Sequence, residues 1–278
     1  GGLRQKNLKV ITGLDVTINE GEILAVVGSS GSGKSLLAHA ILGILPGNAQ
    51  VSGSLHYQGQ ELTRKKQEAM RGTNIALIPQ SVNYLDPLMS VGAQVRSSVR
   101  TGDKNSVQQE VFERYHLDKN TEKVYPFQLS GGMARRVLVS TAVVSGAKLV
   151  IADEPTPGLH PKVVQETLNH LRQLADNGCA VMLITHDISA ALKVAERIAV
   201  FYAGSTVENA PISDFSGEGD NLRHPYSKAL WQALPQNGFK PTPGFQPSPG
   251  SLPPGCLFEP RCPQATAECR KKLPKARE

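Results

Sequence analysis

A run of eight small or polar residues near the start of the chain, from Gly28 to Ser35, has the spacing of a phosphate-binding loop. It matches the pattern G-x4-G-K-[ST] and lies between an apolar run at 23–27 and a helical run at 36–42, the order that this motif requires. Its glycines let backbone N–H groups turn toward phosphate oxygens, and the following helix adds partial positive charge. Lys34 is expected to reach the β- and γ-phosphates, and the Ser35 hydroxyl to ligate Mg²⁺. The sequence therefore predicts a nucleoside triphosphate site formed by Gly28, Ser29, Ser30, Gly31, Ser32, Gly33, Lys34 and Ser35.

Two adjacent carboxylates, Asp153 and Glu154, come directly after an apolar run at 149–152. Such runs are typical of parallel strands, whose carboxyl ends form the ligand-binding edge of an open α/β sheet. We expect Asp153 to hold Mg²⁺, directly or through water, and Glu154 to polarise an attacking water. Two acids at a solvated strand end are the alternative, and the phosphate loop makes that alternative the weaker one.

A third candidate is the sequence Leu-Ser-Gly-Gly at 129–132, which precedes a helical pattern at 134–144. Ser130 is a preferred residue at the start of a helix, and Gly131 and Gly132 leave the backbone free beside it. The result is a second helix N-terminus that could receive an anion. Taken alone, a simple capped turn is the alternative explanation.

These residues lie in a chain of ordinary globular composition. Its 278 residues are 40% hydrophobic and 19% charged, which excludes wholesale disorder, a coiled coil and a fibrous repeat. A net charge of +6 with only 5% aromatic residues gives no nucleic-acid-binding footprint, so no nucleic-acid partner is expected. The apolar runs are far shorter than the roughly 20 residues that span a bilayer. No apolar signal segment stands near the start. We expect a protein that is soluble or that sits on a membrane through partners.

Four continuously apolar runs predict buried parallel strands, at 23–27, 75–78, 149–152 and 180–184. Helical patterns lie between or after them, for example at 162–177, where Pro161 suits the first turn and Gly178 a left-handed stop. Strands that alternate with helices predict an α/β fold with a mainly parallel sheet.

Two parts of the chain have a different texture. Residues 83–146 contain helical stretches at 107–116 and 135–144 and are predicted to form a helical insertion in the α/β core. From residue 211 onward the composition changes, and 241–254 is rich in Pro, Gly and Ser, which predicts an extended linker.

The order of these motifs resembles the ATP-binding cassette (ABC) ATPases. The phosphate loop is followed by Gln80 after the second strand, Leu-Ser-Gly-Gly, the strand ending in Asp153-Glu154, and His186 after the next strand. The resemblance covers roughly residues 8–210. It implies a P-loop NTPase core with a helical signature subdomain at about 83–146, an ATPase domain at 1–210 and a C-terminal extension at 211–278.

The resemblance also implies a role for each motif residue, with ATP and Mg²⁺ bound. Gln80 would contact Mg²⁺ or the lytic water and link the site to a membrane partner, so that the Mg²⁺ ligands would be Ser35, Gln80 and Asp153. Glu154 would be the catalytic base, and His186 would contact the γ-phosphate. Ser130, Gly131 and Gly132 would close on ATP held by the opposite subunit of a head-to-tail dimer.

Shorter segments resemble the peptide/nickel importer branch of this family, namely Met133, the stretch 85–92, the stretch 224–230 and the tail 254–263. An importer of peptides, nickel or metal–metallophore complexes is implied. Its ATPase would lie peripherally on the cytoplasmic face of the inner membrane, with two permease subunits and an extracytoplasmic solute-binding protein.

A non-transport ABC ATPase is the alternative function. The DNA-maintenance type separates the phosphate loop from the strand acids by a very long coiled coil, which this chain lacks. The ribosome-associated or regulatory type usually carries two cassettes in one chain, and one is present here.

Three of the four cysteines, Cys256, Cys262 and Cys269, stand in the tail, whereas Cys179 lies in a buried-strand pattern. Tetrahedral zinc or a [4Fe–4S] cluster needs four ligands. Related tails that hold an iron–sulphur cluster carry a fourth Cys further on, and this sequence has none there. Three reduced thiols in a small clasp and a [4Fe–4S] cluster remain the two interpretations.

The sequence departs from the family pattern at two places. The family usually has an aromatic residue some 20 positions before the phosphate loop to stack on adenine, but the first aromatic here is Tyr57. The family also has an Asp that crosses the dimer interface where this chain has His160, a side chain that cannot accept hydrogen bonds as a carboxylate does. We therefore expect a heterodimer with a second, different ATPase subunit.

Overall fold

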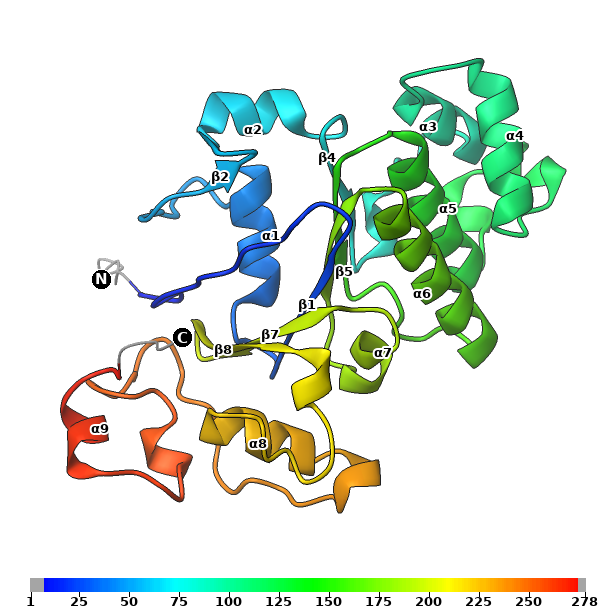
Figure 1. Cartoon of the computed structure of the whole chain (residues 1–278). Coiled ribbons are helices and arrows are strands. Elements are labelled where there is room, and N and C mark those ends of the chain that lie inside the picture. Colours follow the sequence, from blue (N-terminus) through cyan, green and yellow to red (C-terminus); the bar gives the residue numbers. More distant parts are fainter. Residues whose placement is uncertain (1–7, 275–278) are drawn as a thin grey trace, which may run out of the picture.

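The protein is built around a six-stranded sheet with helices on both faces (Figure 1). The structure, a computed structural model, describes residues 8–274. The strand order is β4-β5-β6-β1-β7-β8, in which the first five strands are parallel and β8 is antiparallel to β7. The predicted α/β class with a mainly parallel sheet is confirmed. The strands are β1 (Ile23–Gly28), β4 (Ile75–Ile78), β5 (Leu149–Asp153), β6 (Ala180–Ile184), β7 (Arg197–Tyr202) and β8 (Ser205–Pro211).

All four predicted strands are present, and β1 and β5 each extend one residue further than the apolar run. Strands β7 and β8 were not predicted. The run Ile198-Ala199-Val200-Phe201 in β7 is as apolar as the others and carries the same signal. β8 carries no such signal, because it lies at the sheet edge and only Ser205 and Ala210 of its residues are buried.

Alternate residues of β1 pack against different helices. Ile23, Ala25 and Val27 belong to a core that contains Leu168 of α6, whereas Leu24 and Val26 pack with residues of α1. This alternation follows from the two-residue period of a strand, and it explains why all of β1 is apolar. Helix α1 (Lys34–Leu42) lies on one face of the sheet, and α5 (Gly131–Val144) and α6 (Pro161–Asp176) lie on the other (Figure 1).

The predicted helical insertion is present as α3 (Val91–Ser98), α4 (Lys104–Arg114) and α5, which pack on one another. Gln94 of α3 holds the loop before it, because its side-chain amide donates to the carbonyls of Asp86 and Met89 and accepts from the Asp86 N–H. The smaller elements nearby are β2 (His56–Tyr57), β3 (Gln60–Glu61), α2 (Arg64–Met70) and α7 (Ile188–Leu192).

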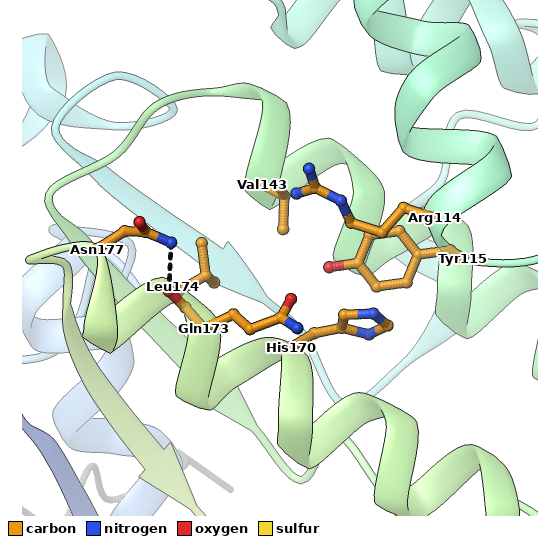
Figure 2. Close-up of a pocket in the computed structure, with 7 residues that line it drawn as sticks. All are labelled: Arg114, Tyr115, Val143, His170, Gln173, Leu174 and Asn177. Atoms are coloured by element: carbon orange, nitrogen blue, oxygen red, sulfur yellow. Dashed lines mark hydrogen bonds between the residues drawn. The ribbon is translucent and has the colours of Figure 1, made fainter.

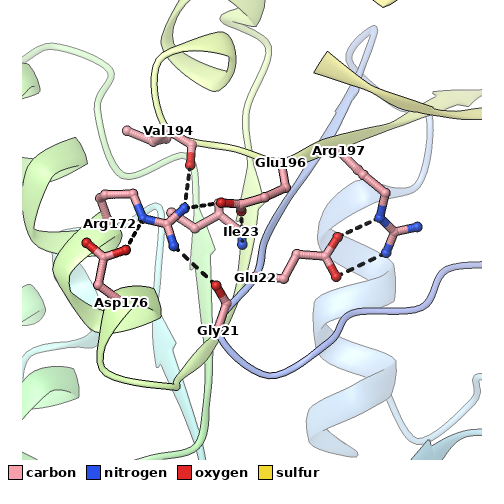
Figure 3. A network of polar contacts seen from close by, with 8 residues as sticks. All are labelled: Gly21, Glu22, Ile23, Arg172, Asp176, Val194, Glu196 and Arg197. Carbon is pink, nitrogen blue, oxygen red and sulfur yellow. Dashed lines mark hydrogen bonds and ion pairs between the residues drawn. The ribbon is translucent and has the colours of Figure 1, made fainter. Parts of the chain in front are cut away.

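A network of charged side chains ties α6 to the amino ends of β1 and β7 (Figure 3). Arg172 of α6 donates to Asp176 at 2.8 Å and to the carbonyls of Gly21 and Val194, and it also pairs with Glu196. Beside it, Glu22 accepts two bonds from the guanidinium of Arg197, at 2.6 and 3.1 Å. The network fixes the end of the sheet opposite the motif residues.

The C-terminal extension packs against the sheet and shares a hydrophobic core with it. Tyr202 of β7 contacts the rings of Tyr226, at 4.4 Å between centroids, and Phe258, at 5.3 Å. Tyr226 lies in α8 (Pro225–Gln232), and the last helix is α9 (Ala267–Lys271). The stretch 241–254 contains no helix or strand, as expected of an extended linker, but Ser29 and Arg261 hydrogen-bond to it, so the expectation that it is not packed on the protein is wrong.

Candidate functional site

The predicted phosphate loop connects β1 to α1, and two of its glycines are required by close contacts. A Cβ at Gly28 would collide with the backbone oxygen of Phe201, and a Cβ at Gly33 would collide with the Ile11 side chain. Both glycines have positive φ, 153° and 101°, which side chains rarely adopt. The strand–loop–helix arrangement that the sequence predicts for residues 28–35 is therefore present.

Lys34 lies folded back over its own loop. Its Nζ donates to the carbonyl of Gly28 at 2.8 Å and to that of Ser29 at 3.1 Å. The side chain is buried, which lowers the pKa of the ammonium group, and the nearby Glu154 and Asp153 partly offset this effect. An anion in the loop would compete with two neutral carbonyls for this cation, and a charged acceptor is the stronger partner.

A cavity of about 200 Å³ brings three of the predicted residues together. Ser35 comes from the start of α1, Gln80 follows β4, and Asp153 ends β5. β4 and β5 are adjacent and parallel, so their carboxyl ends meet at one edge of the sheet. The other lining residues are His39, Leu77, Pro79, Ser81 and Tyr84.

Asp153 has an unmatched oxygen in this cavity. The residue is buried, and among the described residues its Oδ1 has no hydrogen-bond partner. Burial raises the pKa of this carboxyl and Glu154 raises it further, while Ser35, His39 and Lys34 oppose the rise. A hydroxyl, an amide and a carboxylate around one space are oxygen ligands of the kind that Mg²⁺ takes. The residues present therefore fit a magnesium ion.

Glu154 is held in an unusual backbone conformation directly after β5. Its φ is 47°, a left-handed value that costs a non-glycine residue about 1–3 kcal/mol. The backbone N–H donates to the Ile184 carbonyl of β6 at 2.9 Å. The side chain is buried, and its Oε2 lies 2.9 Å from Nδ1 of His186. This strained backbone conformation places the Glu154 carboxylate where β5 and β6 end.

His186 follows β6 and remains two-thirds exposed, with a side-chain exposed fraction of 66%. The turn that carries it is stabilised locally, since Thr185 accepts from the Asp187 N–H and Asp187 caps the start of α7. The structure therefore joins His186 to Glu154, as two residues of one site, and leaves the imidazole accessible.

The Ser-Gly-Gly triplet begins α5 as predicted. Ser130 Oγ accepts from the N–H of Met133 at 3.3 Å, and Gly131 and Gly132 form the first turn of the helix. The triplet does not line the cavity of Ser35, Gln80 and Asp153. Within the part of the chain that the structure describes, the two sets of motif residues remain separate.

Arg135 is a site residue that the sequence analysis missed. It is buried in α5, and its guanidinium donates to the carbonyl of Pro79 at 3.0 Å. Burial lowers the pKa of this group, and the charge of Glu154 opposes that effect. Arg135 thus ties the helix of Ser130 to the loop of Gln80. The available signal was a pair of arginines, Arg135 and Arg136, within the first two turns of the helix that Ser130 caps.

The two departures from the family pattern also have clear positions. His160 is exposed and caps α6, where its Nδ1 accepts from the Lys162 N–H at 3.4 Å. Tyr57, the first aromatic of the chain, packs with the core on the α1 face of the sheet. Residues 1–7, at the edge of the region where an adenine-stacking residue was sought, lie outside the described residues.

The cysteines are not arranged as metal ligands. Within residues 8–274, no group of three or more His, Cys, Asp and Glu side chains could hold a metal ion. Cys179 is buried beside β6, where burial raises its pKa to about 11, and all four cysteines are free thiols. Cys256 and Cys269 are joined instead through their backbones, by an N–H to carbonyl bond of 2.7 Å. The residues present do not fit an iron–sulphur cluster.

A second cavity, of about 360 Å³, lies between the end of α4 and α6 (Figure 2). The ring of His170 packs 4.1 Å from that of Tyr115, and burial lowers the pKa of His170 and raises that of Tyr115. None of the motif residues lines this cavity. Its remaining lining residues are Arg114, Val143, Gln173, Leu174 and Asn177.

None of the helices described in residues 8–274 combines the length and the apolarity needed to cross a membrane.

Comparison with protein families gives two matches along the chain. Residues 11–157 match the family described as "ABC transporter". Residues 207–269 match the family described as "Oligopeptide/dipeptide transporter, C-terminal region". The first match spans the phosphate loop, the helical insertion and the acids after β5, and the second spans the extension.

Whole-chain relatives have similar descriptions. The chain is 34% identical to the dipeptide transport ATP-binding protein DppD of Haemophilus influenzae, over 98% of this chain and 88% of that protein. It is 32% identical to the oligopeptide transport ATP-binding protein AppD of Bacillus subtilis, over 98% and 88%. Among solved structures, the dimeric post-hydrolysis state of the ATP-binding cassette MJ0796, bound to ADP and Pi, has a TM-score of 0.68 at 24% identity. That likeness covers 76% of this chain and 94% of the other, and it shows a common fold.

Proposed function

The chain belongs to the ABC transporter ATPases, and from this premise we propose that it is the ATP-hydrolysing subunit of a peptide importer. Dipeptides and oligopeptides are the proposed substrates, because the curated relatives that match almost the whole chain are dipeptide and oligopeptide transport ATP-binding proteins. Nickel and metal–metallophore complexes are the alternative substrates. A non-transport ATPase is the alternative function.

One observation carries this proposal, namely the occurrence of both family regions in one chain. The ABC transporter region supplies ATP hydrolysis, and the second region is described by its place in oligopeptide and dipeptide transporters. This combination distinguishes the importer from the DNA-maintenance and ribosome-associated alternatives.

The proposed reaction is the in-line attack of water on the γ-phosphorus of ATP, which gives ADP and phosphate. The eight residues of the phosphate loop, which include Lys34, would bind the phosphates. The Glu154 carboxylate would accept the proton from the attacking water as the new O–P bond forms and the bond to the leaving ADP oxygen breaks. His186 would hold this carboxylate and contact the γ-phosphate.

The Mg²⁺ site of the proposal is the cavity where Ser35, Gln80 and Asp153 meet. When bound, the ion would neutralise charge on the phosphates. The chain's own contribution is to hold three oxygen donors from three elements around one space. Gln80 follows β4 and is exposed. This exposure suits its proposed second role as a link to a membrane subunit.

The proposed assembly contains two permease subunits, an extracytoplasmic solute-binding protein and a second, different ABC ATPase. The subunit described here would lie on the cytoplasmic face of the inner membrane. Ser130, Gly131 and Gly132 would close on ATP held by the other ATPase, which is consistent with their separation from the cavity of Asp153. His160 supports an unequal pair, since an imidazole at an interface position cannot replace the acceptor-only carboxylate of an Asp.

For the tail, we propose that Cys256, Cys262 and Cys269 remain reduced thiols in a clasp around the buried Leu257 and Phe258. Iron analysis of anaerobically purified protein tests this proposal. We expect no iron and no visible absorption, and stoichiometric iron would contradict the clasp.

Uptake of labelled peptides by intact cells tests the function as a whole. A strain without the gene should lose uptake of labelled dipeptides and tripeptides, and the wild-type gene should restore it. Glu154→Gln should fail to restore uptake, because it lacks the proposed base. Glu61→Gln is the matched control, since Glu61 is an exposed carboxylate in β3.

Two outcomes would contradict the proposal. Normal peptide uptake together with lost uptake of labelled nickel would move the substrate to the metal alternative. Two results together would favour a non-transport ATPase. The tagged chain would purify without any integral membrane subunit, and cells that lack the gene would still take up peptides normally.

A further inference from the structure

A segment of the C-terminal extension crosses the mouth of the phosphate loop. Gln246 lies 217 positions after Ser29, yet the Ser29 hydroxyl donates to its Oε1 at 2.5 Å. The Gln246 Nε2 also lies 3.9 Å from the point where a Cβ of Gly31 would stand. We call residues 241–254 the strap. The strap therefore hydrogen-bonds to one of the eight residues that are proposed to bind phosphate and passes close to a second.

The strap is fastened by Arg261 on one side of this contact and runs close to Leu8 on the other. On one side, Arg261 donates to the carbonyl of Pro243 at 2.9 Å and to that of Thr242 at 3.1 Å. Arg261 itself lies over the rings of Tyr202 and Phe258, 6.0 and 5.8 Å from their centroids, so it is anchored on the sheet. On the other side, a Cβ at Gly250 would lie 3.9 Å from Leu8.

The strap therefore runs from the phosphate loop to the segment around Leu8, which precedes the phosphate loop in sequence. Leu8 lies 20 positions before Gly28, and Ile11 of the same segment closes over Gly33. A nucleotide whose phosphates occupy the loop must extend its ribose and base outside the loop. The strap and the segment around Leu8 border that space.

Phe245 is an exposed aromatic residue of the strap. It stands next to Gln246, and its side chain is 95% exposed, the highest exposure of any large hydrophobic residue described. An exposed aromatic ring offers a flat face on which a nucleobase can stack. Residues 1–56 contain no Phe, Tyr or Trp, and Tyr57 is packed in the core.

We propose that the strap completes the nucleotide site and that Phe245 is the residue that stacks on the base, held at the loop mouth by the contact between Gln246 and Ser29. The C-terminal extension thereby takes part in ATP recognition. Nucleotide selectivity then depends on residues that follow the ATPase core in sequence. This inference rests on ATP binding, and it does not depend on peptides being the transported substrate.

Binding measurements on the purified full chain test the proposal. The ligands are ATP and inorganic tripolyphosphate, each with Mg²⁺, because tripolyphosphate occupies the loop without offering a base. Phe245→Ala should weaken ATP binding about 5- to 150-fold, which corresponds to the loss of one base–aromatic stack. The affinity for tripolyphosphate should stay within about twofold of the wild-type value. A twofold change is well under the tenfold change in affinity that about 1.4 kcal/mol represents.

Two further variants separate stacking from structure. Phe245→Tyr keeps an aromatic face and should restore ATP affinity. Phe239→Ala removes another exposed aromatic ring of the extension, one with 69% exposure, and should change neither affinity. Thermal unfolding of all three variants should match the wild type, since both side chains are largely in solvent.

Unchanged ATP affinity in Phe245→Ala would overturn the proposal. Equal losses for ATP and tripolyphosphate would overturn it as well, because the ring would then act on the loop and not on the base. Failure of the wild-type chain to bind ATP would refute its function as an ATPase. If Phe245→Ala lost affinity for ATP but not for tripolyphosphate, and deletion of the gene did not affect peptide uptake, only the assignment of peptides as substrates would be refuted.

Discussion

Nδ1 of His186 lies 2.9 Å from Oε2 of Glu154, so the residue after β6 is joined to the residue after β5. An ionised carboxylate carries no hydrogen, and the hydrogen of this bond must therefore sit on the imidazole Nδ1. In the neutral ring, Nε2 then has only a lone pair. To donate to a phosphate from Nε2, His186 must gain a second proton or leave Glu154.

The first prediction concerns the carboxylate of this pair. Glu154→Gln keeps the size of the side chain but removes the base, so turnover should fall by at least about 100-fold while ATP still binds. Steady-state phosphate release and equilibrium ATP binding measure the two properties. Glu61→Gln should leave both unchanged. Hydrolysis within a few fold of the wild-type rate would remove Glu154 from the role of base.

The second prediction concerns the unmatched oxygen of Asp153. Asp153→Asn replaces a charged ligand by a neutral amide, so Mg²⁺ should strengthen ATP binding much less in this variant than in the wild type. Titrations of ATP with and without Mg²⁺, and direct Mn²⁺ binding followed by electron paramagnetic resonance, measure the change. Asp86→Asn, in the loop before α3, is the control. A variant with full Mg²⁺ dependence would exclude Asp153 as a ligand.

The third prediction concerns Arg135, which joins the helix of Ser130 to the loop of Gln80. Arg135→Met fills a similar volume but leaves the buried carbonyl of Pro79 without its donor, which costs about 1–3 kcal/mol of stability. Urea unfolding measures this loss. Because the loop also carries Gln80, we expect the variant to need more Mg²⁺ for half-maximal ATPase activity.

The control for Arg135 is Arg64→Met, an exposed arginine in α2 whose side chain is 83% accessible. It should unfold at the wild-type urea concentration. If Arg135→Met also did so, the contact with Pro79 would carry no stability. If stability fell without any change in Mg²⁺ dependence, Arg135 would have a structural role only.

How far the sequence predicts this molecule depends on the range of the signal. β1, β4, β5 and β6 are predictable because strands covered on both faces are continuously apolar, and the phosphate loop because its glycines are required locally. β8 is not, because it is an edge strand whose pairing with β7 is set by the sheet and not by its own residues.

The residues of the site that escaped the sequence analysis act over long separations. Arg135 reaches the loop of Pro79, 56 positions away, and Gln246 reaches Ser29 across 217 positions. Neither belongs to a short motif, and the sequence around each of them does not show which distant residue it contacts. The same holds for the strap, whose Pro- and Gly-rich composition predicts its lack of helix and strand but not its attachment through Arg261.

The last prediction concerns the pH dependence of stability at the far end of the sheet, where Glu22 pairs with Arg197 (Figure 3). Burial alone would raise the pKa of Glu22. The bonds from Arg197 and Asn19 outweigh it and hold the pKa below the ordinary value of 4.5. A carboxyl with a lowered folded pKa binds fewer protons folded than unfolded near that value. Its contribution is therefore complete above about pH 5 and is lost as the pH falls through the folded pKa.

Glu22→Gln removes this contribution at every pH. At about pH 7 the variant should be less stable than the wild type by about 1.5–3 kcal/mol, the range for hydrogen bonds to charged groups, and the difference should shrink below about pH 4. Urea unfolding across this range measures it. Glu68→Gln breaks the exposed pair with Arg64 and should cost at most about 1 kcal/mol. A difference for Glu22→Gln that stayed constant as the pH fell well below about 4 would show that the amide loses packing rather than charge, because the carboxyl of Glu22 titrates on that descent and the amide does not.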